Sequence, residues 1–283
     1  MLASCGAAAS PNEAFNVEGT SVSITDFDAI TESLVDIGEL TAANGSITGD
    51  DARSVMKQLI QFRAAEHLLD SLGASVTEAD RQSILDQAKQ DPNFQQYPKT
   101  LQDLLIDLNV IGVAVNKVQQ PSSSDLRSMY EKSPASTGAL CLSHILLKTE
   151  ADARDALDEL DRGADFADVA KKSSTEPGTD SSGGSLGNGD EECQLLETLQ
   201  TSFDRDFMIG AVAAKPGVPT GPVKTQFGYH VILSRPWSEV GDSVASVTSE
   251  GPGMALLTGY MATADITVNS RYGTWVGAVG SIN

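Results

Sequence analysis

The chain has 283 residues, a formal net charge of −20 and a hydrophobic content of 40%. Because phosphate binding needs concentrated lysine and arginine, this charge argues against a nucleic-acid partner and against adhesion to anionic lipid by charge alone. No apolar run approaches the roughly 18–20 residues of a membrane span, and the three cysteines include no Cys-x-x-Cys pair, which argues against a zinc or thioredoxin-like site.

The first residues, Leu2-Ala3-Ser4-Cys5, resemble the lipobox of bacterial lipoproteins, and residues 1–13 are predicted to be this motif and a flexible tether. The resemblance implies a lipid on Cys5, and a diacylated cysteine carries the two chains that stable anchoring needs. The basic and apolar parts of a signal peptide are missing before Cys5. Three explanations stay open: a start further upstream, a trimmed sequence, or a chance match.

Residues 14–135 are predicted to form a mostly helical domain. Phe15–Ser23 has apolar residues on both sides of Glu18-Gly19, which is typical of a hairpin. Apolar residues then recur at helical spacing in five segments. These segments lie at about 27–40, 50–72, 77–91, 101–118 and 125–132.

Residues 138–237 have a different pattern. Leu140 to Leu147 alternate with the period of a strand and place His144 between Leu142 and Leu146 on one face. Helices are predicted at 149–162, at 165–172 and around Phe207, with a Gly/Ser loop at 173–189 and a hairpin at 223–234. The order β-α-α-α-β-β indicates an α+β domain with helices packed on a small antiparallel sheet.

The remaining residues are predicted to be a polar linker, 238–264, and a C-terminal strand within 265–283. Ile266 to Trp275 read as a strand and a turn, but so short a segment cannot bury a core alone. We expect it to pair with the strand at Phe15–Val17 and to close the N-terminal domain around an inserted one.

Two of the cysteines fall within the second pattern. A disulfide between Cys141 and Cys193 is compatible with the sequence, but we favour Cys141 as a small buried apolar residue in its strand. Cys193 lies in an acidic loop, and no role follows for it from the sequence.

Three sequence blocks resemble the signatures of parvulin-type peptidyl-prolyl isomerases, in the expected order. They are Ser143-His144-Ile145-Leu146-Leu147-Lys148, Gly184-Ser185-Leu186-Gly187 and Gly221-Pro222-Val223-Lys224-Thr225-Gln226-Phe227-Gly228-Tyr229-His230-Val231-Ile232. The first 130 residues more weakly resemble the chaperone domain of SurA and PrsA foldases, and the ending Val268-Asn269-Ser270-Arg271-Tyr272-Gly273-Thr274-Trp275 resembles actinobacterial-type members.

The resemblance implies a catalytic pair, His144 and His230, on neighbouring strands. The pair would form the floor of the site, or would only stabilise the sheet as core histidines. Counting back from Gly187, the acidic or cysteine position of the family falls at Glu176, which is otherwise an exposed loop acid.

The substrate-binding residues implied by the resemblance are Leu186, Phe207 and Phe227, which would hold the proline. Thr225 would satisfy polar groups near the rim. The register of Phe203 and Met208 stays open. The loop has no basic cluster, which argues against phosphate-directed specificity.

The expected function is cis/trans isomerisation of peptidyl-prolyl bonds and chaperoning of exported proteins, without cofactor or metal. The expected partners are unfolded or proline-containing exported polypeptides and, through Cys5, a membrane outside the cytoplasm. One alternative is a holdase chaperone whose parvulin domain is inactive or weakly active. Another is a cytoplasmic parvulin with an accidental lipobox.

Overall fold

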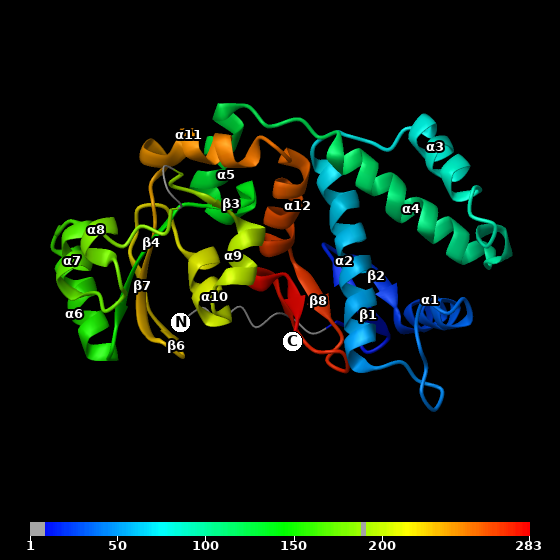
Figure 1. The fold of residues 1–283 in the computed structure, drawn as a ribbon, viewed down its shortest axis with the longest axis horizontal. Helices are drawn as coiled ribbons and strands as arrows, with labels where there is room; N and C mark the ends of the chain where they lie inside the picture. The colour runs from blue at the N-terminus through cyan, green and yellow to red at the C-terminus, as the bar shows by residue number, and fades with distance from the viewer. Residues whose placement is uncertain (1–8, 188–190) are drawn as a thin grey trace. The chain divides into compact units, whose positions relative to one another are not determined.

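The chain divides into two compact units in the computed structural model, which describes residues 9–187 and 191–283 (Figure 1). Unit 1 combines the described residues up to Val118 with Ala264–Asn283, and unit 2 is Gln119–Thr263. The chain therefore leaves unit 1, forms unit 2 and returns. Cys5 lies outside the described residues. Among the described helices, none combines the length and the apolar character that crossing a membrane requires.

The sheet of unit 1 has the strand order β2-β1-β8, from Thr20–Ser23, Glu13–Val17 and Ile266–Val268. The antiparallel register of β1 and β8 pairs Phe15 with Val268, which is the return of the C-terminal segment predicted from the sequence. A short hairpin of β9 and β10 ends the chain, at Trp275–Val276 and Ser281–Ile282, around a 3-10 turn at Gly277–Val279.

The described part of unit 1 also contains four α-helices. They are α1 (Ile24–Asp36), α2 (Gly49–Ser71), α3 (Glu78–Ala88) and α4 (Lys99–Asn116), with a 3-10 turn at Phe94–Gln96. Ser23, Thr48 and Thr77 begin the first three helices, because each hydroxyl accepts a hydrogen bond from a backbone N–H of the first turn. Helix α2 supplies much of the core, including the fully buried Met56 and Ile60.

The main sheet of unit 2 is antiparallel, with the order β4-β7-β6 from Leu142–Leu147, Gly228–Ser234 and Thr220–Thr225. A separate two-stranded ladder joins β3 (Ala139–Leu140) to β5 (Gln194–Leu195). The strand predicted over 140–147 is thus divided at Cys141, whose carbonyl accepts a hydrogen bond from the Arg235 backbone N–H at 2.9 Å.

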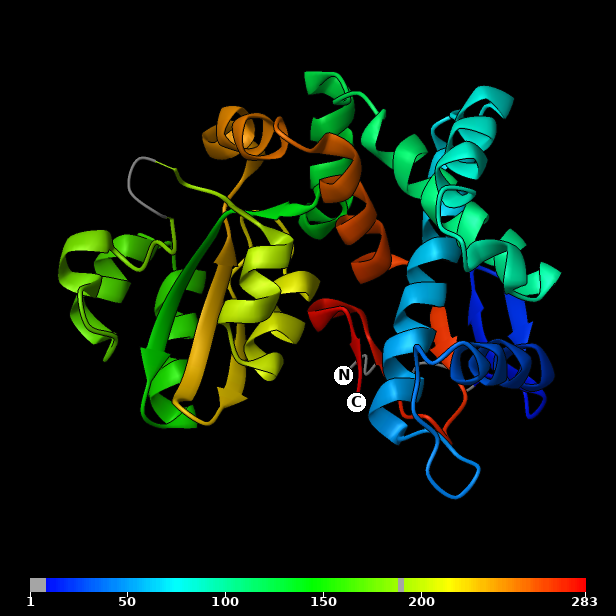
Figure 2. The same cartoon turned by 45° about the vertical axis from the view of Figure 1, so that its right-hand side comes forward.

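Helices cover both faces of this sheet (Figure 1, Figure 2). Helices α6 and α7 pack on one face, where Ile145 and Val231 belong to a shared apolar cluster. Helix α10 packs on the other face, where Gly210 approaches Val223 and Ile232. The bounds are α6 (Glu150–Asp161), α7 (Phe166–Ser173), α8 (Thr179–Ser182), α9 (Leu196–Ser202) and α10 (Arg205–Ala213). The predicted α+β class is confirmed.

The polar linker predicted over 238–264 is wrong. Most of it is α11 (Trp237–Thr248) and α12 (Pro252–Thr263), which join unit 2 together with α5 (Ser123–Lys132) and a 3-10 turn at Pro134–Thr137. Val240 and Val244, one helical turn apart, are fully buried, but the serine, glycine and threonine between such positions give the segment the composition of a linker. Unit 2 is therefore larger than the predicted 138–237 domain, and the first stretch of unit 1 ends at Val118 instead of residue 135.

Glycine allows α12 to pack closely on the 3-10 turn that precedes β3. Gly138 has a φ of +79°, and a Cβ there would lie 2.0 Å from the Ala255 carbonyl oxygen. A Cβ on Gly259 would lie 2.5 Å from the Ala135 carbonyl oxygen. Larger side chains at these two positions would separate α12 from the rest of unit 2.

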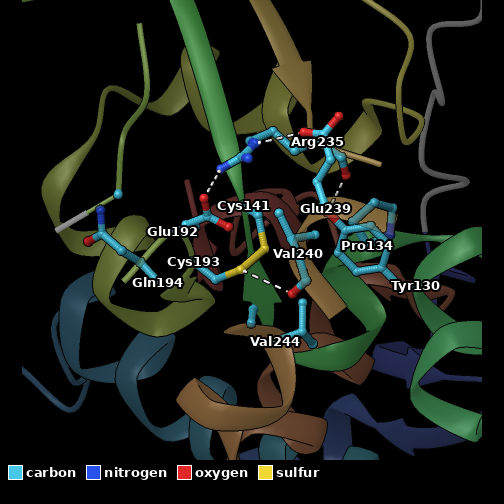
Figure 3. The surroundings of a disulfide bond; sticks show 12 residues. Tyr130, Pro134, Cys141, Glu192, Cys193, Gln194, Arg235, Glu239, Val240 and Val244 are labelled. Carbon is cyan, nitrogen blue, oxygen red and sulfur yellow. Dashed lines mark hydrogen bonds and ion pairs between the residues drawn. A yellow bond between two sulfur atoms is a disulfide. The ribbon is translucent and has the colours of Figure 1, made fainter. Parts of the chain in front are cut away.

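Cys141 is buried, as the preferred interpretation expected, but it lies between β3 and β4 and forms a disulfide with Cys193 (Figure 3). Their Cα atoms are 4.1 Å apart, and the two side chains are buried in a cluster with Val240 and Val244 of α11. Beside it, Arg235 forms ion pairs with Glu192 at 3.1 Å and with Glu239 at 3.2 Å (Figure 3). The acidic segment before β5 is thus fixed to the helical layer.

Candidate active site

Strands β4 and β7 bring the two predicted histidines together. The register pairs His144 with Ile232 and Leu146 with His230, so the histidines are diagonal neighbours. Because side chains alternate along a strand, His144 and His230 lie on the opposite face from Ile145 and Val231. They therefore face α10.

The two imidazoles form part of a hydrogen-bonded chain. The Nδ1 atoms of His144 and His230 are 3.2 Å apart, and His230 Nε2 is 2.9 Å from Thr225 Oγ1. Thr225 Oγ1 also accepts a hydrogen bond from the Phe227 backbone N–H at 3.1 Å. Since one Nδ1 must donate and the other accept, the tautomer of one ring determines that of the other.

Burial favours the neutral form of both histidines by lowering the pKa of each. Burial is the main cause that lowers the pKa of His144 to about 4, and the neighbouring His230 lowers it further. Burial also lowers the pKa of His230, while the carboxylate of Asp204 opposes that shift. Each side chain is only 5% exposed, so the site presents uncharged hydrogen-bonding groups in an apolar setting.

The ring of Phe207, on α10, packs against both imidazoles. Its ring centroid lies 5.7 Å from that of His144 and 5.1 Å from that of His230, in edge-to-face geometry. Phe203 stacks on Phe207 at 5.0 Å and is half-buried. Phe207 itself is 1% exposed. Substrate contact by Phe207 stays a prediction, and Phe203 is the more accessible of the two rings.

A segment of loop runs along the outer edge of β4 and carries Leu186. The His144 backbone N–H donates to the Gly184 carbonyl at 2.8 Å, and the Leu186 N–H donates to the Leu142 carbonyl at 2.9 Å. A Cβ on Gly184 would lie 2.4 Å from the His144 carbonyl oxygen, so glycine is required there. Leu186 is half-buried at this edge.

Glu176 lies beside the same edge of β4, near the other end of that strand. Its backbone N–H donates to Ser174 Oγ at 3.2 Å, and that hydroxyl accepts from the Leu146 N–H at 3.2 Å. The side chain is half-buried. Its carboxylate forms no ion pair or hydrogen bond with any residue in 9–187 or 191–283.

The turn between β6 and β7 carries the most exposed aromatic ring of the site. Phe227 is 67% exposed, whereas Thr225 before it is buried. Gln226 donates from Nε2 to Asp204 Oδ2 at 3.4 Å, and Asp204 also caps α10 by accepting from the Asp206 N–H at 2.9 Å. Sequence reasoning missed Asp204, although an aspartate just before a helix is a recognisable N-cap signal.

The structure thus places His144, His230, Thr225 and Phe207 in direct contact and joins Phe227 to them through its backbone. Leu186 and Glu176 follow the adjoining strand edge. Among the described side chains, no group of three or more histidine, cysteine, aspartate or glutamate residues is arranged to hold a metal ion.

The family model of the rotamase, or PPIC-type PPIase, domain matches residues 144–235. This range contains both histidines and the strands that carry them. Residues 144–235 form a parvulin-type domain.

Two sequence relatives of the chain are named foldase protein PrsA. That of Clostridium botulinum strain Hall is 35% identical over 144 residues, which cover 47% of this chain and 40% of the relative. That of Clostridium kluyveri strain ATCC 8527 is 40% identical over 106 residues, which cover 38% of this chain and 28% of the relative. The chain thus matches less than half the length of these relatives.

Solved structures also resemble the chain. PrsA from Bacillus subtilis is 20% identical, with 89% of this chain and 93% of that chain covered and a TM-score of 0.32. NmPin, the parvulin of Nitrosopumilus maritimus, is 24% identical, with 35% of this chain and 96% of that chain covered and a TM-score of 0.30. The assignment of the parvulin domain rests on the family model and the sequence relatives.

Proposed function

We propose that the chain is a peptidyl-prolyl cis/trans isomerase and a folding chaperone for exported proteins. The observation that carries the isomerase proposal is the neutral, hydrogen-bonded pair of His144 and His230 on Phe207, inside the range of the PPIC-type model. Resonance gives the amide before proline a rotation barrier of about 18–20 kcal/mol, and the uncatalysed reaction takes about 10–100 s. Catalysis requires a site that favours the twisted amide over the planar one.

The chemistry needs no covalent intermediate. The twisted amide has lost its resonance and is less polar than the planar amide, so an apolar surface with a few placed hydrogen bonds favours it. In this proposal His144 and His230 form the floor of the site, and the Thr225 hydroxyl is hydrogen-bonded to His230 Nε2. Leu186 and Phe227 contact the proline, and Glu176 adjusts the electrostatics of the rotating amide.

The test is isomerisation of a proline-containing tetrapeptide by the full chain. His144→Asn keeps a polar group near the Nδ1 position but removes the imidazole, and kcat/KM should fall about tenfold or more. The matched control is His67→Asn in unit 1, where His67 contacts Thr20 at 3.0 Å, and its turnover should equal that of the wild type. Equal turnover of the His144→Asn protein, with its fold intact, would refute the proposed mechanism.

A second candidate function, holding unfolded chains, is favoured by a hollow of about 620 Å³ in unit 1. Helices α1 to α4 line it, and Leu34, Leu40, Phe94 and Leu105 are among its apolar residues. Apolar side chains of an unfolded client would be removed from water there.

Suppression of client aggregation tests this function independently of turnover. Leu105→Glu places a charge in the hollow and should abolish suppression, whereas Gln82→Glu adds the same charge on the exposed face of α3 and should not. Suppression without any tetrapeptide turnover would identify a holdase. Suppression unaffected by Leu105→Glu would contradict the assignment of the hollow.

We further propose that the protein works outside the cytoplasm and carries a lipid on Cys5. The buried disulfide between Cys141 and Cys193 supports an oxidising compartment, because cytosolic thiols are kept reduced. The lipobox-like Leu2-Ala3-Ser4-Cys5 supports the anchor. Metabolic labelling with an alkyne fatty acid should mark the wild type and not Cys5→Ala. Labelling of both proteins, or of neither, would contradict the anchor.

A further inference from the structure

A second depression, of about 590 Å³, lies on unit 2 beyond the end of β7. Its apolar lining consists of Pro216, Val218, Pro236 and Trp237. Val218 is 51% exposed, and the other three are half-buried. The inner part of Trp237 packs on Tyr130, with ring centroids 5.6 Å apart. Two prolines and a tryptophan that is already packed on a neighbouring ring have little conformational entropy to lose when a ligand packs on them.

The charged residues of this depression are mostly cations. Arg127 and Glu131 of α5 form an ion pair at 2.8 Å. The other two charged groups of the lining are the ammonium groups of Lys132 and Lys215. Both lysines are exposed, and neither forms an ion pair with another residue in the described part of the chain. A chain with a net charge of −20 thus has two uncompensated positive charges beside an apolar surface.

Strand β7 connects the depression to the candidate active site over a short distance. Pro216 is bridged to Ser234, and the Gly217 N–H donates to the Ser234 carbonyl at 2.7 Å, so the loop before β6 meets the last residue of β7. His230 lies four residues earlier on the same strand, which corresponds to roughly 13 Å at about 3.3 Å per residue. An extended polypeptide of about four or five residues covers such a distance.

We propose that this depression is a second polypeptide-binding site, which takes an extended segment that carries carboxylates together with an aromatic ring or a proline. The apolar side chains would pack on Trp237 and the two prolines, as extended proline-rich segments do in aromatic-lined grooves. The carboxylates would neutralise Lys132 and Lys215. Acidic segments, which the rest of this acidic chain repels, would be attracted to this place.

The second site has a consequence for turnover, and this part rests on the proposed isomerase function. A client held beyond β7 presents its neighbouring prolyl bonds to His144 and His230 at a raised local concentration. KM should therefore be lower for a long acidic peptide than for its lysine-substituted counterpart, with kcat unchanged. A tetrapeptide is too short to gain from the second site.

Trp237 reports binding directly. In the full chain with Trp275→Phe, Trp237 is the remaining tryptophan. The probes are a twelve-residue peptide of repeated Glu-Phe-Pro and the same peptide with lysine for glutamate. We expect saturable quenching by the acidic peptide and about tenfold weaker binding after Lys132→Glu with Lys215→Glu. The control pair, Lys148→Glu with Lys171→Glu, makes the same charge change elsewhere on unit 2 and should bind as the parent does.

Three results would overturn the inference. They are equal binding of the acidic and basic peptides, binding unchanged by the reversal at Lys132 and Lys215, and a parent protein that sediments as a dimer and dissociates after that reversal. The last would identify a second copy of this chain as the occupant. Tetrapeptide turnover is measured on the same proteins. Turnover without acidic-peptide binding refutes only the second site, and binding without turnover refutes only the isomerase.

Discussion

Removing the disulfide between Cys141 and Cys193 should lower the free energy of unfolding of unit 2 by about 4 kcal/mol. The bond joins residues separated by 52 positions. Loop-closure entropy for such a separation is about 14 cal/mol/K, which is about 4 kcal/mol at 25 °C. Both cysteines are at most 1% exposed, so the native fold holds the sulfur atoms in place and the main effect of the bond falls on the unfolded chain.

Urea unfolding with tryptophan emission measures this effect. Trp275→Phe removes the tryptophan of unit 1 and leaves Trp237, which packs in the cluster around the disulfide. With an m-value of about 2 kcal/mol/M, a loss of about 4 kcal/mol shifts the midpoint by about 2 M. The protein treated with a reductant and the Cys141→Ala/Cys193→Ala variant should have the same lowered midpoint. Oxidised, reduced and variant proteins that unfold at one midpoint would refute the reasoning.

Three further predictions follow from the candidate site and the packing of unit 2. As pH falls from about 6.5 to 4, His144 should cost unit 2 about 3 kcal/mol of stability, because a pKa of about 4 for folded His144 means that the unfolded chain binds the proton first. In urea unfolding, the slope with pH should be smaller for His144→Asn, which keeps only the contribution of His230. Asp204→Asn keeps the helix cap but removes the carboxylate, so the pKa of His230 should fall further in an NMR titration, and an unchanged pKa would exclude the electrostatic role of Asp204. Gly138→Ala should destabilise unit 2 by about 2 kcal/mol or more in thermal unfolding. Gly163 also has a positive φ, but nothing lies within 4 Å of an added Cβ there, so Gly163→Ala should destabilise unit 2 by only about 1 kcal/mol.

The resemblance to a known family, and not the strand pattern alone, predicted that the two histidines lie together. A period of two assigns each side chain to one face of its own strand, whereas the pairing of β4 with β7 joins segments far apart in the chain. The burial of Phe207 could not be predicted in this way. It depends on how α10 packs on the sheet, and a phenylalanine that supports a site and one that lines it have the same local sequence.

The sequence analysis did not predict the disulfide or the last two helices, and the reasons differ. Cys141 and Cys193 approach each other only because β3 pairs with β5, and this contact joins segments far apart in the chain. The serine and glycine residues between the buried valines of α11 give that helix the composition of a linker. Helix α12 buries Leu256, Leu257 and Met261, so its apolar residues were a signal that the linker prediction missed.

The strand order β2-β1-β8 also has a consequence for synthesis. As the chain emerges from the ribosome, β1 can pair with β2 at once, but its other edge has no partner until Ile266–Val268 has been made. By then all of Gln119–Thr263 is available to fold. Unit 2 is therefore the first that can be completed, and the N-terminal sheet is finished last.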